Sequence, residues 1–245
     1  MELSASQSTK IRIAMLILFS LFLLRGFAQN SVQASQIMKD IREGKTISYE
    51  NMTIDGDLDF TYMEEKLPDL PRKSKWWNNG SSNTVEESID VAISFKNCTF
   101  TGDVLAYIHE DKSGYTFVAD FDKDVVFVDC TFNKNAMFKY SDFDGIADFS
   151  GADFQRKSTF KYAEFDDRAD FSNTHFDDDA TFKYAQFDEG ASFKNAVFEE
   201  SWNIKYLKAR GEFDIAGLEV RDDIDEKYTK INGKSFTNHL VNSRN

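Results

Sequence analysis

Phenylalanine recurs through the middle of this chain at steps that alternate between six and five residues without a slip. The series consists of Phe121, Phe127, Phe132, Phe138, Phe143, Phe149, Phe154, Phe160, Phe165, Phe171, Phe176, Phe182, Phe187, Phe193 and Phe198. One step of six and one of five make a repeating unit of eleven residues. Eleven residues is also the period of a right-handed helical supercoil, so a helix must be considered. However, positions five or six apart point in widely different directions on a helix and form no apolar stripe. The spacing therefore argues against a helical array.

Short strands satisfy the spacing, because alternate residues of a strand point to the same side. Alanine stands two positions before many of the Phe residues, as Ala152 before Phe154 and Ala163 before Phe165. The segments between these pairs, such as DDR, DDD and DEG, are rich in turn formers. Each step is therefore expected to be a short strand with inward Ala and Phe, followed by a polar corner.

A longer period indicates how many steps close one coil. The units that begin at Phe138, Phe160 and Phe182 read FKYSDFDGIAD, FKYAEFDDRAD and FKYAQFDEGAS. The units between them, at Phe149 and Phe171, read FSGADFQRKST and FSNTHFDDDAT. Units 22 residues apart match better than units eleven apart, which predicts a four-sided coil of 22 residues whose like positions stack at the strand spacing of about 4.8 Å.

The A-x-F-x-x pattern, seen in Ala152-Asp153-Phe154 and Ala163-Glu164-Phe165, resembles the pentapeptide-repeat proteins of the Phe-rich variety with alternating five- and six-residue steps. The resemblance implies an all-β fold, a right-handed quadrilateral parallel β-helix, over most of the chain. It supplies no catalytic motif, so it says much about the fold and little about function.

The same frame can be followed in both directions, which predicts a solenoid of six or so coils over residues 47–220. Its continuation falls on apolar or small residues: Ile47, Tyr49, Met52, Ile54, Leu58, Phe60, Ile93, Phe95, Cys98, Phe100, Trp202, Ile204, Leu207, Ala209, Phe213, Ile215, Leu218 and Val220. The open ends of a solenoid need covers. Ser35 as N-cap and Gly44 as stop predict a short capping helix within residues 29–46, and residues 221–245 form a C-terminal cap or tail.

One long interruption, residues 61–90, contains both prolines, Pro68 and Pro71, and reads LPDLPRKSKWWNNGSSN in its middle. Insertions in solenoids emerge as loops on one side and are often functional. A patch of cations and aromatic rings on an acidic rod suits docking. The candidate binding residues are Arg72, Lys73, Lys75, Trp76 and Trp77. The alternative is that the tryptophans fold back over a coil face and the charges are merely solvated.

The two cysteines, Cys98 and Cys130, occupy the inward small-residue position in the matching pentads NCTF and DCTF. They should point into the core. A second break, near Tyr107 to Ser113, could place them on neighbouring coils, where their spacing would permit a disulfide. Buried free thiols are the alternative.

On the outside, the 22-residue match stacks like residues in rows. The predicted rows are Lys139, Lys161 and Lys183; Tyr140, Tyr162 and Tyr184; and Asp144, Asp166 and Asp188. Stacked tyrosines attract through ring contacts, whereas stacked like charges repel. Carboxylate rows can hold calcium, but the Asp-rich corners lack the Gly-punctuated spacing of calcium loops. We therefore expect no metal ligands and no cofactor.

The first 28 residues have the pattern of an export signal. Lys10 and Arg12 precede a twelve-residue apolar run, Ile13 to Leu24, and small residues follow before Gln29. The run is short of the roughly 20 residues that span a bilayer, so a membrane anchor that stays uncleaved is the alternative. With the signal at residues 1–28 removed, the chain would be exported to the periplasm, the cell envelope or the outside, with no remaining membrane span.

Catalysis has little support. The three histidines, His109, His175 and His239, are scattered, and although His175 should lie one coil above Asp153, no nucleophile elbow, phosphate loop or metal-ligand spacing accompanies them. We therefore expect no catalytic residues. A β-helix enzyme acting on acidic polysaccharides remains an alternative.

The formal charge of −13 predicts repulsion from phosphate backbones, so no nucleic-acid partner is expected. The favoured function is a non-catalytic scaffold or binding module whose partner is an unidentified protein or envelope component. Some family members are acidic rods that mimic DNA and bind DNA gyrase, which is the alternative if the chain is not exported. The oligomeric state, including a homodimer, stays open.

Overall fold

The computed structural model describes residues 30–71 and 83–243, with side chains to residue 239. All its elements belong to one compact unit, Ser31–Asn245. The predicted signal segment, residues 1–28, lies outside the described residues. Within the ranges that are described, no helix is long and apolar enough to cross a membrane.

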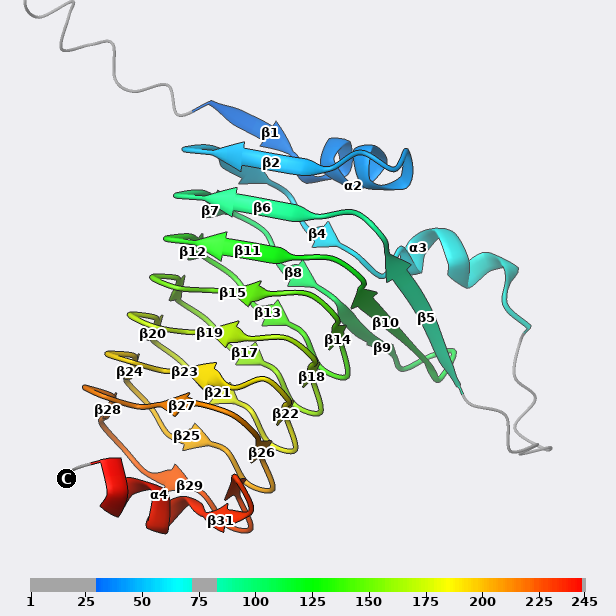
Figure 1. Ribbon diagram of the computed structural model, residues 1–245. Coiled ribbons are helices and arrows are strands. Elements are labelled where there is room, and N and C mark those ends of the chain that lie inside the picture. Colours follow the sequence, from blue (N-terminus) through cyan, green and yellow to red (C-terminus); the bar gives the residue numbers. More distant parts are fainter. Residues whose placement is uncertain (1–29, 72–82, 244–245) are drawn as a thin grey trace, which may run out of the picture. The chain divides into compact units, whose positions relative to one another are not determined.

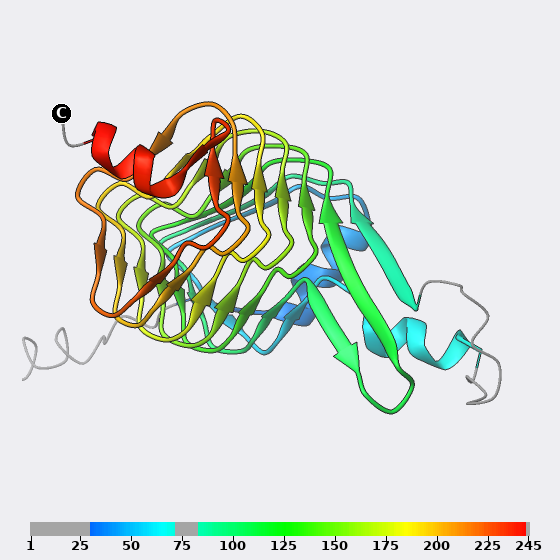
Figure 2. The ribbon, with the colours of Figure 1, turned by 90° about the horizontal axis from the view of Figure 1, so that it is seen from below.

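The described residues fold into four sheets, which we call A, B, C and D, and each coil visits them in the order B, A, C, D (Figures 1 and 2). Sheet A contains β1 (Ser31–Gln33), β3 (Thr53–Asp55), β7 (Thr99–Phe100), β12 (Thr131–Phe132), β16 (Asp153–Phe154), β20 (His175–Phe176), β24 (Val197–Phe198) and β28 (Glu219–Val220). Sheet B contains β2 (Ile47–Glu50), β6 (Ile93–Lys96), β11 (Val125–Val128), β15 (Ala147–Asp148), β19 (Ala169–Asp170), β23 (Ala191–Ser192) and β27 (Phe213–Asp214).

The other two sheets and the helices complete the fold. Sheet C contains β4 (Leu58–Asp59), β8 (Val104–Leu105), β13 (Ala136–Met137), β17 (Ser158–Thr159), β21 (Ala180–Thr181), β25 (Trp202–Asn203) and β29 (Ile224–Asp225). Sheet D contains β5 (Thr84–Ile89), β10 (Tyr115–Phe121), β14 (Asp142–Phe143), β18 (Glu164–Phe165), β22 (Gln186–Phe187), β26 (Lys208–Ala209), β30 (Lys230–Ile231) and β31 (Lys234–Ser235), with β9 (Tyr107–Glu110) paired to β10. The helices are α2 (Ala34–Arg42), α3 (Met63–Lys66), the 3₁₀ turn η1 (Leu67–Asp69) and α4 (Phe236–Ser243).

The register confirms the 22-residue coil. Successive coils pair in parallel, so that Phe143 lies opposite Phe165 and Phe154 opposite Phe176. The Phe side chains of these strands fill the interior, where the ring centroids of stacked pairs are 4.8 Å apart for Phe143 and Phe165 and 4.9 Å apart for Phe154 and Phe176. Rings of neighbouring stacks meet edge to face, as Phe165 does with Phe171. The core is thus a set of aromatic columns parallel to the coil axis.

The frame followed beyond the Phe series is also correct. Most of its positions are buried, including Ile54, Trp202 and Ile204, and the remainder pack against the core. Regular strands continue past Val220, the predicted end of the coils, as β28 is followed by β29 and β30.

Both interruptions leave the solenoid at the corner between sheets C and D. Across the first, Ile47 pairs with a residue 46 positions on, Ile93, and across the second, Thr99 pairs with Thr131. The first interruption is more than a loop: between residues 61 and 90 it contains α3, η1 and β5, and β5 pairs in parallel with β10. The second forms the antiparallel hairpin β9–β10. Sheet D therefore carries two long strands at its N-terminal end (Figure 2).

The ends of the solenoid are covered. Helix α2 buries Ile37 and Ile41 over the first coil, and it ends where Gly44 adopts a left-handed conformation (φ +72°), as predicted. Ser35 is not the N-cap, which corrects the prediction: the helix already begins at Ala34, because the preceding residues form β1 on the edge of sheet A. At the other end, Phe236 of α4 packs against Trp202.

The corners use left-handed backbone twice per coil. Asn173 and Asn195 occupy one of these corners, as suits the short amides that tolerate positive φ. The other corner places tyrosines there: Tyr140, Tyr162, Tyr184, Tyr206 and Tyr228. A left-handed residue with a Cβ costs roughly 1–2 kcal/mol, and stacking of each tyrosine ring on the next offsets part of this cost.

The two cysteines lie on neighbouring coils, since Thr99 and Thr131, which follow them, are paired in the sheet. Both are buried and both are free thiols. Of the two sequence-based alternatives, the structure therefore contains the buried free thiols rather than the disulfide.

Replacing Phe165 by alanine tests the aromatic columns. The Phe165 ring is 1% exposed and stacks on Phe143 and Phe187. We expect the free energy of unfolding to fall by about 3–5 kcal/mol, the usual cost of truncating a buried Phe. Guanidinium unfolding followed by circular dichroism measures it. Ile146→Ala, at a side chain 44% exposed, is the control and should change the free energy by less than roughly 0.5 kcal/mol. Equal midpoints for the two variants would contradict the stacking model.

Candidate functional site

The outer surface of sheet D forms a groove of about 560 Å³, which we call the sheet D groove. It is lined by Thr84, Glu86, Thr116, Val118, Asp120, Tyr140, Asp142, Tyr162, Glu164, Tyr184 and Gln186. The strands supply these side chains because outward positions alternate with the inward Phe positions. The long strands β5 and β10 extend the groove at its N-terminal end, and the tyrosine corner forms its side wall.

A row of carboxylates runs through the groove. Asp142 lies between Asp120 and Glu164 on adjacent strands, and its backbone N–H donates to Asp120 Oδ1 at 3.0 Å. Burial raises the pKa of Asp142 to about 7, and the negative charges of Asp120, Glu164 and two nearby aspartates add to the shift. Burial likewise raises the pKa of Asp120. Within the described part of the chain, none of the ion pairs involves these three residues.

The charge of this row changes along the sheet. Beyond Glu164 the same outward position is occupied by Gln186, then by Lys208 and Lys230. The Gln186 side-chain amide donates to Glu164, so one neutral residue separates the acidic coils from the basic ones. The carboxylates of this row are therefore confined to the N-terminal half of sheet D.

The tyrosine wall has its ring faces occupied. Ring centroids are 4.9 Å apart for Tyr140 and Tyr162 and 4.6 Å apart for Tyr162 and Tyr184, with nearly parallel planes, which confirms the predicted row. Each ring also has a lysine ammonium near it, as Lys161 Nζ lies 5.0 Å from the centre of Tyr162. Because the inner rings cover one another, they offer edges and hydroxyls to a ligand rather than flat faces. The wall is therefore unsuited to stacking on sugar rings or bases along its length.

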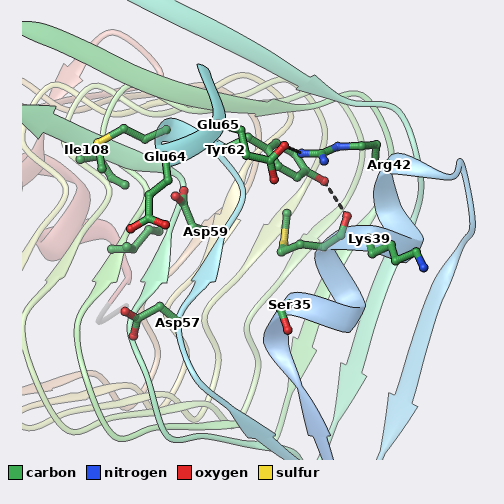
Figure 3. A pocket seen from close by; sticks show the side chains of 12 residues that line it. Ser35, Lys39, Arg42, Asp57, Asp59, Tyr62, Glu64, Glu65 and Ile108 are labelled. Atoms are coloured by element: carbon green, nitrogen blue, oxygen red, sulfur yellow. Dashed lines mark hydrogen bonds and ion pairs between the residues drawn. The ribbon is translucent and has the colours of Figure 1, made fainter. Parts of the chain in front are cut away.

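A second concave surface lies at the N-terminal end, between α2 and the segment that leads into α3 (Figure 3). This cavity has a volume of about 460 Å³. Its polar groups are largely paired with each other: Arg42 forms an ion pair with Glu65 and lies over the Tyr62 ring, and the Tyr62 hydroxyl donates to Met38 O at 2.8 Å. These contacts hold the capping helix to the first coil. We interpret this cavity as part of the packing between the capping helix and the first coil.

One carboxyl in the N-terminal cavity also has a raised pKa. Burial raises the pKa of Asp59, while hydrogen bonds from the Thr61 hydroxyl and backbone N–H act in the opposite direction. Its oxygen is thus already engaged within the chain. The sheet D groove, in which Asp120, Asp142 and Glu164 form no ion pair with any described residue, is the stronger candidate site.

The five binding residues predicted from the sequence, Arg72, Lys73, Lys75, Trp76 and Trp77, lie outside the described residues. The structure places the two ends of that segment. The chain leaves the described part at Pro71, whose carbonyl accepts a hydrogen bond from the Tyr115 hydroxyl at 3.1 Å, and it returns just before β5. Sequence reasoning did not identify the sheet D groove, although the outward Asp and Glu at 22-residue spacing could have indicated it.

The predicted pairing of His175 with Asp153 is correct, because the two lie opposite each other on β20 and β16. Two further carboxylates, Asp177 and Glu199, also contact the imidazole. The other histidines lie elsewhere: His109 contacts Thr116 in the hairpin, and His239 contacts the backbone of Phe213. The three histidines do not converge on one site.

Comparison with known proteins identifies the repeat. The family model described as pentapeptide repeats (9 copies) matches residues 119–164 and 160–202, from the end of β10 to the start of β25. No curated protein and no solved structure matches the chain.

Stability should depend on pH through the carboxylate row. The folded pKa of Asp142, about 7, lies above the value of about 3.9 for an unfolded chain. Its protonation therefore stabilises the fold below about pH 4, and this contribution is lost as the pH rises to about 7. We expect Asp142→Asn and the parent to have similar urea midpoints at pH 4, and the variant to have the higher midpoint at pH 8.

Gln186→Glu is the matched variant with the opposite charge change. It lengthens the acidic row next to Glu164, so it should lower the urea midpoint at pH 8 more than at pH 4. If the urea midpoint of each variant differs from that of the parent by the same amount at pH 4 and at pH 8, the repulsion within the row does not affect the stability of the fold.

Proposed function

The chain is a pentapeptide-repeat protein, and from this premise we propose that it is an exported binding scaffold that holds a cationic segment of a partner protein in the sheet D groove. Proteins of this family are typically non-enzymatic repeat proteins. Their coils supply a rigid surface on which side chains are held at fixed spacing. The proposal concerns what this surface binds and where in the cell it does so.

The observation that carries the proposal is the row of Asp120, Asp142 and Glu164, none of which forms an ion pair within the described residues. Burial is the largest cause of the raised pKa of Asp142, and the negative charges of the neighbouring carboxylates add to it. Lysine or arginine side chains of a partner would lower that repulsion and form charge-assisted hydrogen bonds with the carboxylates. Complementary charge of this kind favours fast and selective association, and it weakens as salt is added.

The scaffold role follows from the aromatic columns. The backbone of each coil is bound to the next by hydrogen bonds such as Phe149 N–H to Asp170 O at 2.7 Å, and the outward side chains are held on that backbone. A partner therefore meets a surface that needs little ordering on binding, which reduces the entropic cost. We propose a second contact in the segment that precedes β5 in the sequence, since β5 lines the groove. Its candidate residues are Arg72, Lys73, Lys75, Trp76 and Trp77.

Export is proposed on the pattern of the first 28 residues alone. An apolar run of twelve residues behind two basic residues, followed by small residues before Gln29, is typical of a cleaved signal. The alternative function, an acidic DNA mimic that binds gyrase, would use the same negatively charged groove as the favoured function. The two differ in compartment, because gyrase acts on DNA inside the cell.

We expect the protein recovered from cells to begin at or near Gln29 and to occur in the envelope or secreted fraction. Mass spectrometry of the N-terminal peptide after fractionation measures both. A protein that retains Met1 in the cytosolic fraction would contradict export and would favour the gyrase alternative. A retained Met1 in the membrane fraction would instead support the uncleaved anchor.

We expect partner capture to depend on the groove. Crosslinking pull-down with tagged protein should recover a partner with the parent, and the double variant Asp142→Asn with Glu164→Gln should lose most of that capture. The control is Asp214→Asn with Asp225→Asn, which removes the same charge from sheets B and C. Capture by the parent should also fall as ionic strength rises.

Two outcomes of the pull-down would contradict the groove as the binding site. If the groove variant and the control capture the same partner equally well, the carboxylate row is not the contact. If capture is lost only when Trp76 and Trp77 are changed to alanine, the second segment is the contact and the coils are its support.

A further inference from the structure

We propose that Asp153, His175 and Asp177, on the outer surface of sheet A, form a binding site for a divalent transition-metal ion of the zinc class. The cluster lies on a different sheet from the groove and plays no part in the proposed function. Asp153 ends up beside His175 because β16 and β20 are adjacent and in register. Asp177 follows β20 directly, two residues after His175, so it points to the same side.

The three donor atoms are spaced as ligands of one ion would be. His175 Nδ1 lies 3.4 Å from Asp153 Oδ1 and 3.1 Å from Asp177 Oδ1. All three donor atoms lie within 4.8 Å of one another. Two ligands at the usual zinc distances of about 2.0–2.1 Å, in tetrahedral arrangement, are separated by about 3.3 Å. The two distances from the imidazole nitrogen therefore match the edge of a zinc coordination sphere.

The imidazole is oriented as a metal ligand would be. Its other nitrogen, Nε2, lies 2.8 Å from Glu199 Oε1 on the next coil. An ionised carboxylate can only accept, so Nε2 carries the proton and Nδ1 is the nitrogen left to bind an ion. Glu199 is itself held by Arg221. A carboxylate behind a histidine in this way is the common support of metal-binding histidines.

A second observation points to a missing ligand at Asp153. Its Oδ2 accepts a hydrogen bond from the Gln155 side chain at 3.1 Å. Its Oδ1, by contrast, is buried and accepts no hydrogen bond from any described residue. Buried polar atoms normally have a partner, and this one faces His175 Nδ1. An ion between them would satisfy Oδ1 and balance the two aspartates.

The donor set selects the class of ion. Calcium and magnesium take oxygen ligands almost exclusively, whereas one imidazole with two carboxylates suits zinc and its neighbours in the transition series. Three protein ligands leave a fourth position for water or for a group of another molecule. Asp177 and Gln155 also line a surface hollow of about 580 Å³, so a further ligand could approach from that side. The expectation of no metal ligands rested on the spacing of the Asp-rich corners. The site proposed here differs from those corners, because it includes a histidine on a coil face.

The test uses untagged full-length protein, first dialysed against a chelator and then against chelator-free buffer. Zinc chloride is titrated by calorimetry, and cobalt(II) chloride is titrated in parallel, because bound cobalt reports its coordination by visible absorption. We expect one zinc equivalent to bind to the parent, and cobalt to give the intense bands of a four-coordinate site. His175→Ala should abolish both signals.

Two further variants separate ligands from support. Asp153→Asn should weaken zinc binding at least about tenfold as the loss of a ligand, and Glu199→Gln should weaken it by about 10–100-fold through the orientation of the imidazole. His109→Ala, which removes a histidine of the hairpin, is the matched control and should bind zinc like the parent. Circular dichroism of each variant checks that the coils remain folded.

The proposal is overturned if zinc does not bind to the parent, or if His175→Ala binds it as tightly as His109→Ala does. Cobalt bands of a six-coordinate, fully hydrated ion would also overturn it. None of these outcomes depends on whether the sheet D groove binds a partner.

Discussion

The parallel pairing of successive coils is the constraint on which the rest of this structure depends. Backbone hydrogen bonds hold each coil to the next at the spacing of neighbouring strands, about 4.8 Å, and they place a residue directly over the residue 22 positions on. Side chains in the same place of successive coils cannot avoid each other. The interior accepts this because flat Phe rings stack well at that distance. The small residues beside them leave room for the rings.

On the outer surface the same constraint has two different results. Where like residues follow each other, as Asp120, Asp142 and Glu164 do on sheet D, the repulsion between them adds to the effect of burial in raising the pKa of Asp142. Where unlike residues follow each other, as Asp153 and His175 do on sheet A, they form a compact polar cluster. Which result occurs is decided by single substitutions at 22-residue spacing, while the backbone and the aromatic columns stay the same.

The regular part of the fold was predictable because it depends on local spacing. The Phe steps, the coil length and the tyrosine row all follow from a period that the sequence repeats many times. The irregular parts depend on pairing between distant segments: β5 becomes a strand only because β10 lies beside it. Ser35 has the chemistry of an N-cap, but after strand β1 the N-cap position falls on Gln33, two residues earlier. Glu199 reaches His175 diagonally, from 24 residues away, so a search at the coil spacing misses it.

The change of sign along sheet D gives the surface a polarity. Carboxylates occupy the row on β10, β14 and β18, and ammonium groups occupy it on β26 and β30. The charge separation is parallel to the coil axis, so the row behaves as a fixed dipole that does not average out by side-chain motion. A charged molecule that lies along the sheet is therefore favoured in one of its two directions, because the reversed placement brings like charges together at both ends. A repeat whose backbone is nearly the same from coil to coil thereby gives its surface a direction through charge.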